Sequence, residues 1–235
     1  GVVNDDKNSD GSFIAPLADK VINARENLVL PVAVEAGPYA TEIILANVTN
    51  GAKTARLKWV PDGVPNGSVV VEYPLPARAQ LVIPDWVEAL RKAGFSIPAK
   101  GTRLAGAVFV TVKDGSVSGV SISARVLNPA TDQPAAKATD WGHYGVHYPA
   151  ATKTCLTTQA SWLAGLRQDD QNRTNMAIVN TGEVDGTAST YRVELYDGDL
   201  GTKAGETFVS NLPYERFIQL DRVLEKYAPG VANAY

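Results

Sequence analysis

Disulfides, membrane spans and a basic surface are all missing from this sequence. Its 235 residues include a single cysteine, Cys155, so no disulfide can form within the chain. No apolar run approaches the roughly 18 residues that a membrane-spanning helix needs. The 22 Lys and Arg residues are outnumbered by 25 Asp and Glu residues, which gives a formal net charge of -3. These absences argue against a nucleic-acid partner and predict no membrane span.

Catalytic and metal-binding patterns are scarce as well. His143 and His147 are the only histidines, and their spacing would suit a zinc site on a helix. The glycines and aromatic residues around them favour a strand instead, on which the two imidazoles stand about 13 Å apart, too far for one ion. Residues 115–119 read Gly-Ser-Val-Ser-Gly, in the wrong phase for a nucleophile elbow. We therefore predict that the chain is not an enzyme and holds no cofactor, apart from a candidate calcium ion.

The alternating pattern of β-strands, in contrast, is abundant. Val120, Ile122 and Ala124 alternate with Ser121 and Ser123, as expected when one face of a strand meets a core and the other meets water. Asp-Gly and Asn-Gly pairs between such stretches favour tight turns. In a chain long enough for two domains of roughly 110–130 residues, this pattern predicts an all-β fold of two tandem β-sandwiches. The residues expected in the two cores are Leu45, Trp59, Val108, Ile122, Ile178, Val193 and Leu195.

Two short segments depart from the β pattern. Residues 85–93 begin at Asp85 and are followed by Gly94, with apolar residues at helical spacing between them. Residues 221–227 repeat this layout, with Asp221 as the expected N-cap. Each segment is about two turns long, so we predict one short capping helix on each sandwich.

The two helices belong to an internal repeat. Upstream of them, residues 41–47 match residues 174–180. Leu75, before the first helix, matches Leu212, before the second. The spacing of matched residues runs from 133 to 137, and a nearly constant period over several elements indicates a duplicated module.

The two copies of this module end at different points. In the first copy, a strand at residues 120–128 closes the sandwich, whereas the second copy is expected to lack its closing strand. Gly1, Val2, Val3 and Asn4 resemble the end of that strand, so we hypothesise that they complete a neighbouring sandwich of the second type by strand addition. The alternative is that they pair within the first sandwich. The predicted segments are an N-terminal strand or hairpin at residues 1–14, a first sandwich at residues 28–128 and a second at residues 138–235.

The N-terminal segment also contains a candidate calcium loop. Asp6, Asn8 and Asp10 stand at alternate positions and are followed by Gly11, as in the first half of an EF-hand loop. Leu17 occupies the place of the bidentate glutamate, so the expected affinity is that of weak extracellular sites, roughly 0.1–1 mM. The alternative is a plain hairpin turn, in which Asn, Asp and Gly are also favoured.

Trp141, Tyr144 and Tyr148 form a candidate aromatic patch at the start of the second predicted sandwich. Exposed aromatic rings can stack on a sugar, so a glycan is a candidate partner. The alternative is that these rings pack between the two sandwiches.

Several strings in the sequence resemble a known family. They are residues 2–5 with 10–14, 144–146 with 149–150, 163–167, 173–181, 191–198 and 217–221. Together they resemble secreted bacterial Ig-like repeat proteins, which occur in tandem on exported multidomain proteins. The resemblance implies Ig-like sandwiches and an extracellular or bacterial cell-surface location. We expect a non-catalytic structural or adhesive module that associates with itself or with neighbouring repeats, or alternatively a carbohydrate- or peptide-binding module.

Overall fold

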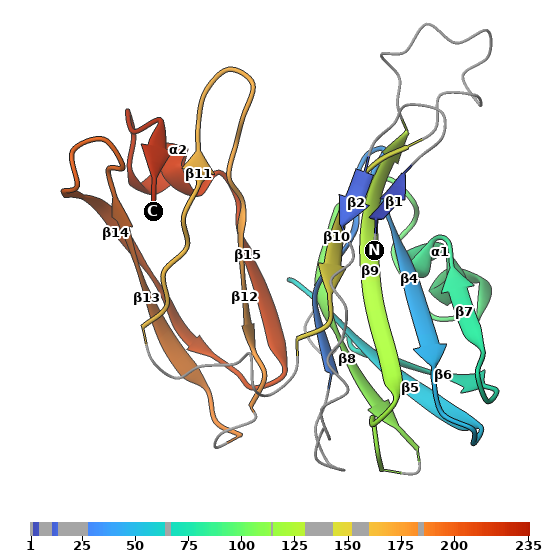
Figure 1. Ribbon diagram of the computed structural model, residues 1–235. Coiled ribbons are helices and arrows are strands. Elements are labelled where there is room, and N and C mark those ends of the chain that lie inside the picture. The colour runs from blue at the N-terminus through green and yellow to red at the C-terminus, as the bar shows by residue number, and fades with distance from the viewer. Residues whose placement is uncertain are drawn as a thin grey trace, which may run out of the picture. The chain divides into compact units, whose positions relative to one another are not determined.

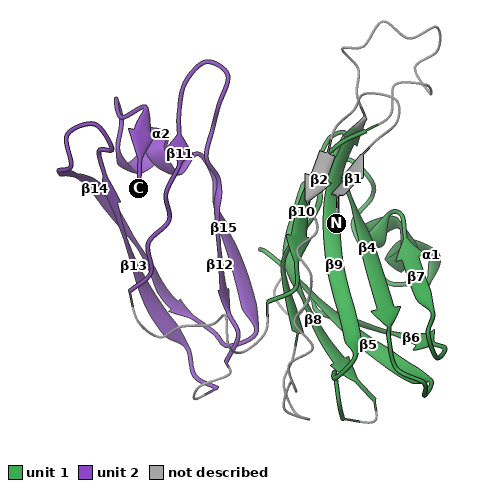
Figure 2. Ribbon diagram, in the orientation of Figure 1, with its two compact units in different colours: residues 1–155 green, residues 156–235 purple. Residues whose placement is uncertain are grey.

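The fold is all-β, as predicted. The computed structural model describes residues 2–4, 11–13, 28–63, 67–113, 115–129, 143–151, 160–182 and 186–235. In these residues, antiparallel strands dominate and two short helices occur, α1 (Trp86–Lys92) and α2 (Val223–Tyr227) (Figure 1). No helix within this described part is long and apolar enough to cross a membrane. The chain divides into two compact units, unit 1 (Gly1–Cys155) and unit 2 (Leu156–Tyr235) (Figure 2).

Unit 1 contains two four-stranded antiparallel sheets. In spatial order, the first consists of β10 (His143–Pro149), β9 (Val120–Pro129), β4 (Ala40–Asn47) and β7 (Gln80–Ile83). The second consists of β3 (Leu28–Glu35), β8 (Leu104–Val112), β5 (Lys53–Pro61) and β6 (Val69–Leu75). A separate hairpin joins β1 (Val2–Asn4) to β2 (Gly11–Phe13). The consecutive strands β8 and β9 are therefore inner strands of different sheets.

The two sheets of unit 1 share one core. Leu45 of β4 and Ile122 of β9 belong to the same buried cluster as Trp59 of β5 and Val108 of β8, and none of the four is more than 1% exposed. This burial confirms the prediction for these four residues. It follows from the period of two, which directs alternate side chains of each strand to the inner face.

A buried ion pair holds α1 to the second sheet. Asp85 caps the helix as predicted, since its side chain accepts the N–H of Glu88 at 3.2 Å. In the last turn, the guanidinium of Arg91 donates two hydrogen bonds to Glu35 of β3, at 2.7 and 2.5 Å. Glu35 is only 1% exposed, so this bidentate contact compensates a charge that would be costly to bury alone.

Unit 2 is built from three antiparallel strand pairs. They are β11 (Leu166–Arg167) with β16 (Asn233–Ala234), β12 (Met176–Asn180) with β15 (Arg216–Leu220), and β13 (Ser189–Tyr196) with β14 (Lys203–Leu212). The segment containing β16 also contacts the end of β13, because Tyr196 and Tyr235 exchange two backbone hydrogen bonds of 2.9 and 3.1 Å. This layer therefore has the order β11, β16, β13, β14.

Some core and cap predictions for unit 2 are wrong. Leu195 is buried as expected, and Val193 is half-buried and packs against the same core cluster, whereas Ile178 is only half-buried. The helix α2 is capped by Arg222 in the left-handed conformation, with φ of 50°, and no side-chain hydrogen bond closes this end. Asp221, the predicted N-cap, instead accepts a hydrogen bond from Gln219. Strand alternation could not reveal that the neighbours needed to cover Ile178 and Val193 are missing from the described part of this unit.

The predicted boundary between the units also needs correction. Residues 143–149, assigned by the sequence to the second sandwich, form β10 and pair with β9 along its length. The division falls after Cys155 instead. Alternation identifies a strand but does not show which sheet it joins.

Candidate binding surfaces

Matched threonines of the internal repeat make the same hydrogen bonds in both units. The Oγ1 atom of Thr41 accepts the N–H of Val34 at 2.7 Å and donates to the carbonyl of the same residue at 2.9 Å. The Oγ1 atom of Thr174 makes both bonds with Arg167, at 2.8 and 2.9 Å. In each unit the hydroxyl therefore holds the start of one strand segment against the backbone of another.

Matched asparagines also have the same role. The Nδ2 atom of Asn47 donates to the carbonyls of Gly51 and Leu75, at 2.8 and 3.1 Å. The Nδ2 atom of Asn180 donates to the carbonyl of Leu212 at 2.9 Å. Leu212 is the residue that the sequence matched to Leu75, and both asparagines are almost fully buried. Each amide thus satisfies backbone groups that the fold removes from water.

The strand registers agree as well. In unit 1, Ile43 of β4 pairs with Ile83 of β7. In unit 2, Met176 of β12 pairs with Leu220 of β15, which are the residues at the predicted repeat spacing. Similarly, β16 lies between β11 and β13 as β8 lies between β3 and β5.

The matched strands differ in what lies beside them. In unit 1, β4 pairs with β9 along its whole length on the side away from β7. In unit 2, the matched strand β12 pairs only with β15, as far as the described residues extend. Among the described residues, β12 therefore has a neighbour on one side only, whereas the matched strand β4 has a neighbour on each side.

Several apolar side chains of unit 2 are exposed or half-buried at positions that match buried residues of unit 1. Trp162 and Leu163 occupy the positions that match Val29 and Leu30 of β3. The two residues of β3 are at most 3% exposed, whereas Trp162 is 70% and Leu163 is 54% exposed. The half-buried Ile178 and Val193 match core residues of unit 1 in the same way. We refer to Trp162, Leu163, Ile178 and Val193, with the adjoining backbone of β12 and β13, as the open edge of unit 2.

An aromatic cluster adjoins the open edge. The rings of Tyr196 and Tyr235 are stacked, with centroids 5.5 Å apart and an interplanar angle of 12°. Trp162 lies against both, with centroid distances of 5.7 and 5.9 Å. The sequence analysis did not predict this cluster. The available signal was the repeat spacing, which aligns Trp162 with a core position of unit 1.

Comparisons with known proteins do not identify this chain. No family model matches it, and no curated protein matches it. Among solved structures, "Crystal Structure of Thermotoga maritima 1070" aligns with a TM-score of 0.38 and 11% sequence identity, over 55% of this chain and 96% of that one. A similarity of this size identifies neither a shared fold nor a shared function.

Five of the ten residues predicted to form sites lie outside the part of the chain that the structure describes. The candidate calcium residues Asp6, Asn8 and Asp10 lie outside the described residues, as do Gly1 and Trp141. Val2–Asn4 form β1, which pairs with β2. In the part of the chain that the structure describes, no three His, Cys, Asp or Glu residues form a group able to hold a metal ion.

The two tyrosines of the predicted aromatic patch lie on β10. Tyr148 packs against the core of unit 1, and burial raises the pKa of its hydroxyl above the ordinary value. Tyr144 is four residues earlier on the same strand and is half-buried. The predicted patch stays a prediction, because its third member, Trp141, lies outside the described residues. His143 and His147 lie on this strand too, which confirms the prediction that they belong to a strand and not a helix. At this spacing on a strand, the two imidazoles are too far apart to bind one ion.

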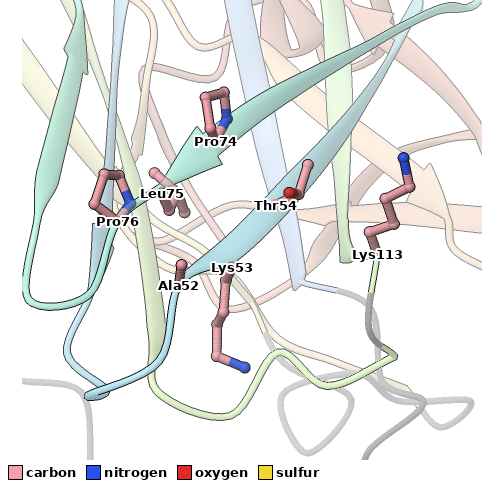
Figure 3. A pocket seen from close by; sticks show the side chains of 7 residues that line it. All are labelled: Ala52, Lys53, Thr54, Pro74, Leu75, Pro76 and Lys113. Carbon is pink, nitrogen blue, oxygen red and sulfur yellow. The ribbon is translucent and has the colours of Figure 1, made fainter.

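A hollow of about 470 Å³ lies at one end of β5 and β6 in unit 1 (Figure 3). Its charged lining residues are Lys53 and Lys113, and both already have partners. Lys53 donates to the carbonyl of Ser116 at 3.2 Å, and Lys113 contacts the carboxylate of Glu72 at 3.2 Å. The other described lining residues are apolar or uncharged. The lining residues are Ala52, Lys53, Thr54, Pro74, Leu75, Pro76 and Lys113.

Proposed function

We propose that this chain is a non-catalytic structural module of a secreted or cell-surface protein, built from two copies of one Ig-like sandwich repeat. The observation that carries the proposal is the recurrence of the same buried hydrogen bonds, from Thr41 and Thr174 and from Asn47 and Asn180, at the repeat spacing. What the two units have in common is a set of backbone contacts rather than a chemical site. Such a pattern supports a scaffold that is repeated for its shape.

The N-terminal hairpin supports association between copies. Val2–Asn4 resemble Val126, Leu127 and Asn128 at the end of β9. Both segments pair with the strand that follows them, since Asn4 lies opposite Gly11 as Asn128 lies opposite Tyr144. In unit 1, the end of β9 pairs with the start of β4. We propose that β1 of one copy completes the matching position beside β12 of another, which gives head-to-tail assembly.

Deletion of residues 1–12 is the experiment that tests this function. We expect the full chain to self-associate as its concentration rises, and the truncated chain to remain monomeric, because the donor strand is removed. Sedimentation velocity over a micromolar to millimolar range measures the difference. A control chain that retains its length, with residues 1–12 replaced by glycine and serine, should behave like the truncated one. A full chain that stays monomeric throughout this range would contradict the proposed assembly.

A carbohydrate-binding module is the second candidate function, favoured by the aromatic cluster of unit 2. Trp162 is exposed beside two stacked tyrosines, which is a suitable arrangement for stacking on a sugar ring. For this function, a glycan array should show binding that Trp162→Ala reduces at least about fivefold, since the loss of one aromatic stacking contact is worth about 1–3 kcal/mol. Tyr214→Ala, at another exposed aromatic residue of unit 2, is the matched control and should leave binding unchanged.

A further inference from the structure

We propose that the outer face of the β13–β14 hairpin in unit 2 binds a neutral oligosaccharide, and that the aromatic cluster is one end of this surface. The inference rests on the carbohydrate-binding candidate function and specifies the class of sugar and the extent of the site. The residues of the outer face are Arg192, Glu194 and Tyr196 of β13, and Lys203, Glu206 and Phe208 of β14.

Strand alternation separates this face from the core. Leu195 of β13 and Val209 of β14 point inward and are at most 6% exposed. Their neighbours Glu194 and Phe208 therefore point outward, and Phe208 is 55% exposed. In the strand register, Phe208 lies directly opposite Arg192. The outer face thus carries an exposed ring beside a guanidinium.

Two cations and two carboxylates form a charged quartet on this face. The guanidinium of Arg192 contacts Glu194 at 2.8 Å and Glu206 at 3.0 Å. The ammonium of Lys203 contacts the same two carboxylates, at 2.8 and 2.6 Å. Hydrogen bonds from Lys203 and Arg192 lower the pKa of Glu206, and the hydrogen bond to Glu194 raises the pKa of Lys203. The charges of the quartet therefore persist and balance at neutral pH.

The quartet presents fixed hydrogen-bonding groups to solvent. Its ion pairs use Oε1 of Glu194 and Oε2 of Glu206, and a carboxylate has about four acceptor positions on its two oxygens. The second oxygen of each carboxylate can therefore accept a hydrogen bond from a sugar hydroxyl. Because the ion pairs already hold these side chains in place, binding orders them at a smaller entropic cost.

Aromatic rings flank the quartet at both ends. Phe208 lies at one end, opposite Arg192. Tyr196 is four residues further along β13, which corresponds to about 13 Å on a strand. Its ring stacks on Tyr235 and lies against Trp162. Both ends can stack on sugar rings while the quartet between them meets hydroxyl groups, so the surface suits an oligosaccharide better than a single sugar.

The balanced charge of the quartet favours a neutral ligand. Single-stranded nucleic acids also stack on aromatic rings, but they need a surplus of Lys and Arg to neutralise their phosphates. Each cation of the quartet is already matched by a carboxylate, so an anionic ligand would have to separate these pairs. A neutral oligosaccharide needs no such rearrangement.

The test measures binding of the full chain, by titration calorimetry, to neutral sugars of glucose, mannose, galactose and N-acetylglucosamine, from single sugars to hexasaccharides. We expect one of the hexasaccharides to bind at least about tenfold more tightly than its single sugar, because it reaches both aromatic ends. Phe208→Ala should weaken this binding at least about fivefold. Tyr214→Ala is the matched control and should leave it unchanged, since Tyr214 is 54% exposed but lies outside the hairpin.

A charge variant tests the preference for neutral sugars. Glu194→Gln with Glu206→Gln keeps the shape of the side chains but leaves Arg192 and Lys203 without their counter-charges. We expect it to weaken binding of the neutral hexasaccharide at least about fivefold, because charged acceptors are lost, and to raise the affinity for hexagalacturonate, an anionic sugar chain. Glu225→Gln, at an exposed carboxylate outside the hairpin, should change neither affinity.

The outcomes separate this inference from the function on which it rests. Sugar binding that Trp162→Ala abolishes but Phe208→Ala leaves intact would overturn the extended site, while carbohydrate binding by the aromatic cluster would stand. Absence of binding to every sugar tested would reject the carbohydrate-binding function as well. Tighter binding of hexagalacturonate than of any neutral sugar by the unmodified chain, or loss of self-association in Phe208→Ala, would show a different partner on this face and overturn the inference.

Discussion

Replacement of Arg91 by alanine is expected to destabilise unit 1 by about 3–5 kcal/mol, because it leaves the carboxylate of Glu35 buried without its cation. The substitution removes both hydrogen bonds that the guanidinium donates to Glu35, a residue with almost no access to water. Chemical denaturation, followed by the fluorescence of the buried Trp59 and Trp86, measures the change.

Two further variants identify the cause. The double variant Glu35→Leu with Arg91→Met should recover most of the loss, since apolar residues of similar volume often replace a buried ion pair without net cost. Arg222→Ala removes an exposed ion pair with Glu225 and should change stability by less than about 1 kcal/mol. If Arg91→Ala is as mild as Arg222→Ala, the buried pair does not stabilise α1.

The pH dependence of this stabilisation follows from the direction in which folding shifts the pKa of Arg91. The hydrogen bond to Glu35 raises the pKa of Arg91 above its ordinary value. A group whose pKa is raised by folding stabilises the folded state fully at any pH below its unfolded pKa, and the contribution is lost only as the pH rises through the folded value. The stabilisation from the arginine is therefore expected to be constant across the neutral range.

Asn47→Ala and Asn180→Ala are each expected to destabilise their own unit by about 2–4 kcal/mol, because several backbone groups lose their partner at once. The Asn47 amide donates to the carbonyls of Leu75 and Pro76, both at 3.1 Å, besides that of Gly51. The Asn180 amide donates to those of Thr187 and Leu212. Hydrogen exchange measured by mass spectrometry should show faster exchange in unit 1 for the first variant and in unit 2 for the second.

The neighbouring Asn50 provides the control for this pair. Its side chain is exposed and accepts one hydrogen bond from Arg78, at 3.0 Å. Asn50→Ala should therefore change stability by no more than about 0.5 kcal/mol. If only one of the two substitutions at the buried asparagines lowers stability, the matched hydrogen bonds do not contribute equally to stability. The repeat would then be less regular energetically than its geometry indicates.

The repeat itself could be predicted from the sequence because it depends on local chemistry. Asn47 and Asn180, and Thr41 and Thr174, recur because a buried backbone group needs the same side-chain partner wherever the same turn or strand crossing is built. The cap at Asp85 was predictable for the same reason, since it involves only residues within one turn of helix. Strand existence was predictable from the period of two.

Only the tertiary structure decided which strands lie together. Three features join residues that no local pattern connects. They are the pairing of β10 with β9 in unit 1, the ion pair between Glu35 and Arg91, and the stacking of Tyr196 on Tyr235. The incomplete burial of Ile178 belongs here too, because burial depends on neighbouring strands and the alternation of β12 is the same with or without them. The sequence by itself therefore determined the all-β class, the duplicated positions and the first helix cap, whereas pairing across long separations decided the boundary between the units and the open edge of unit 2.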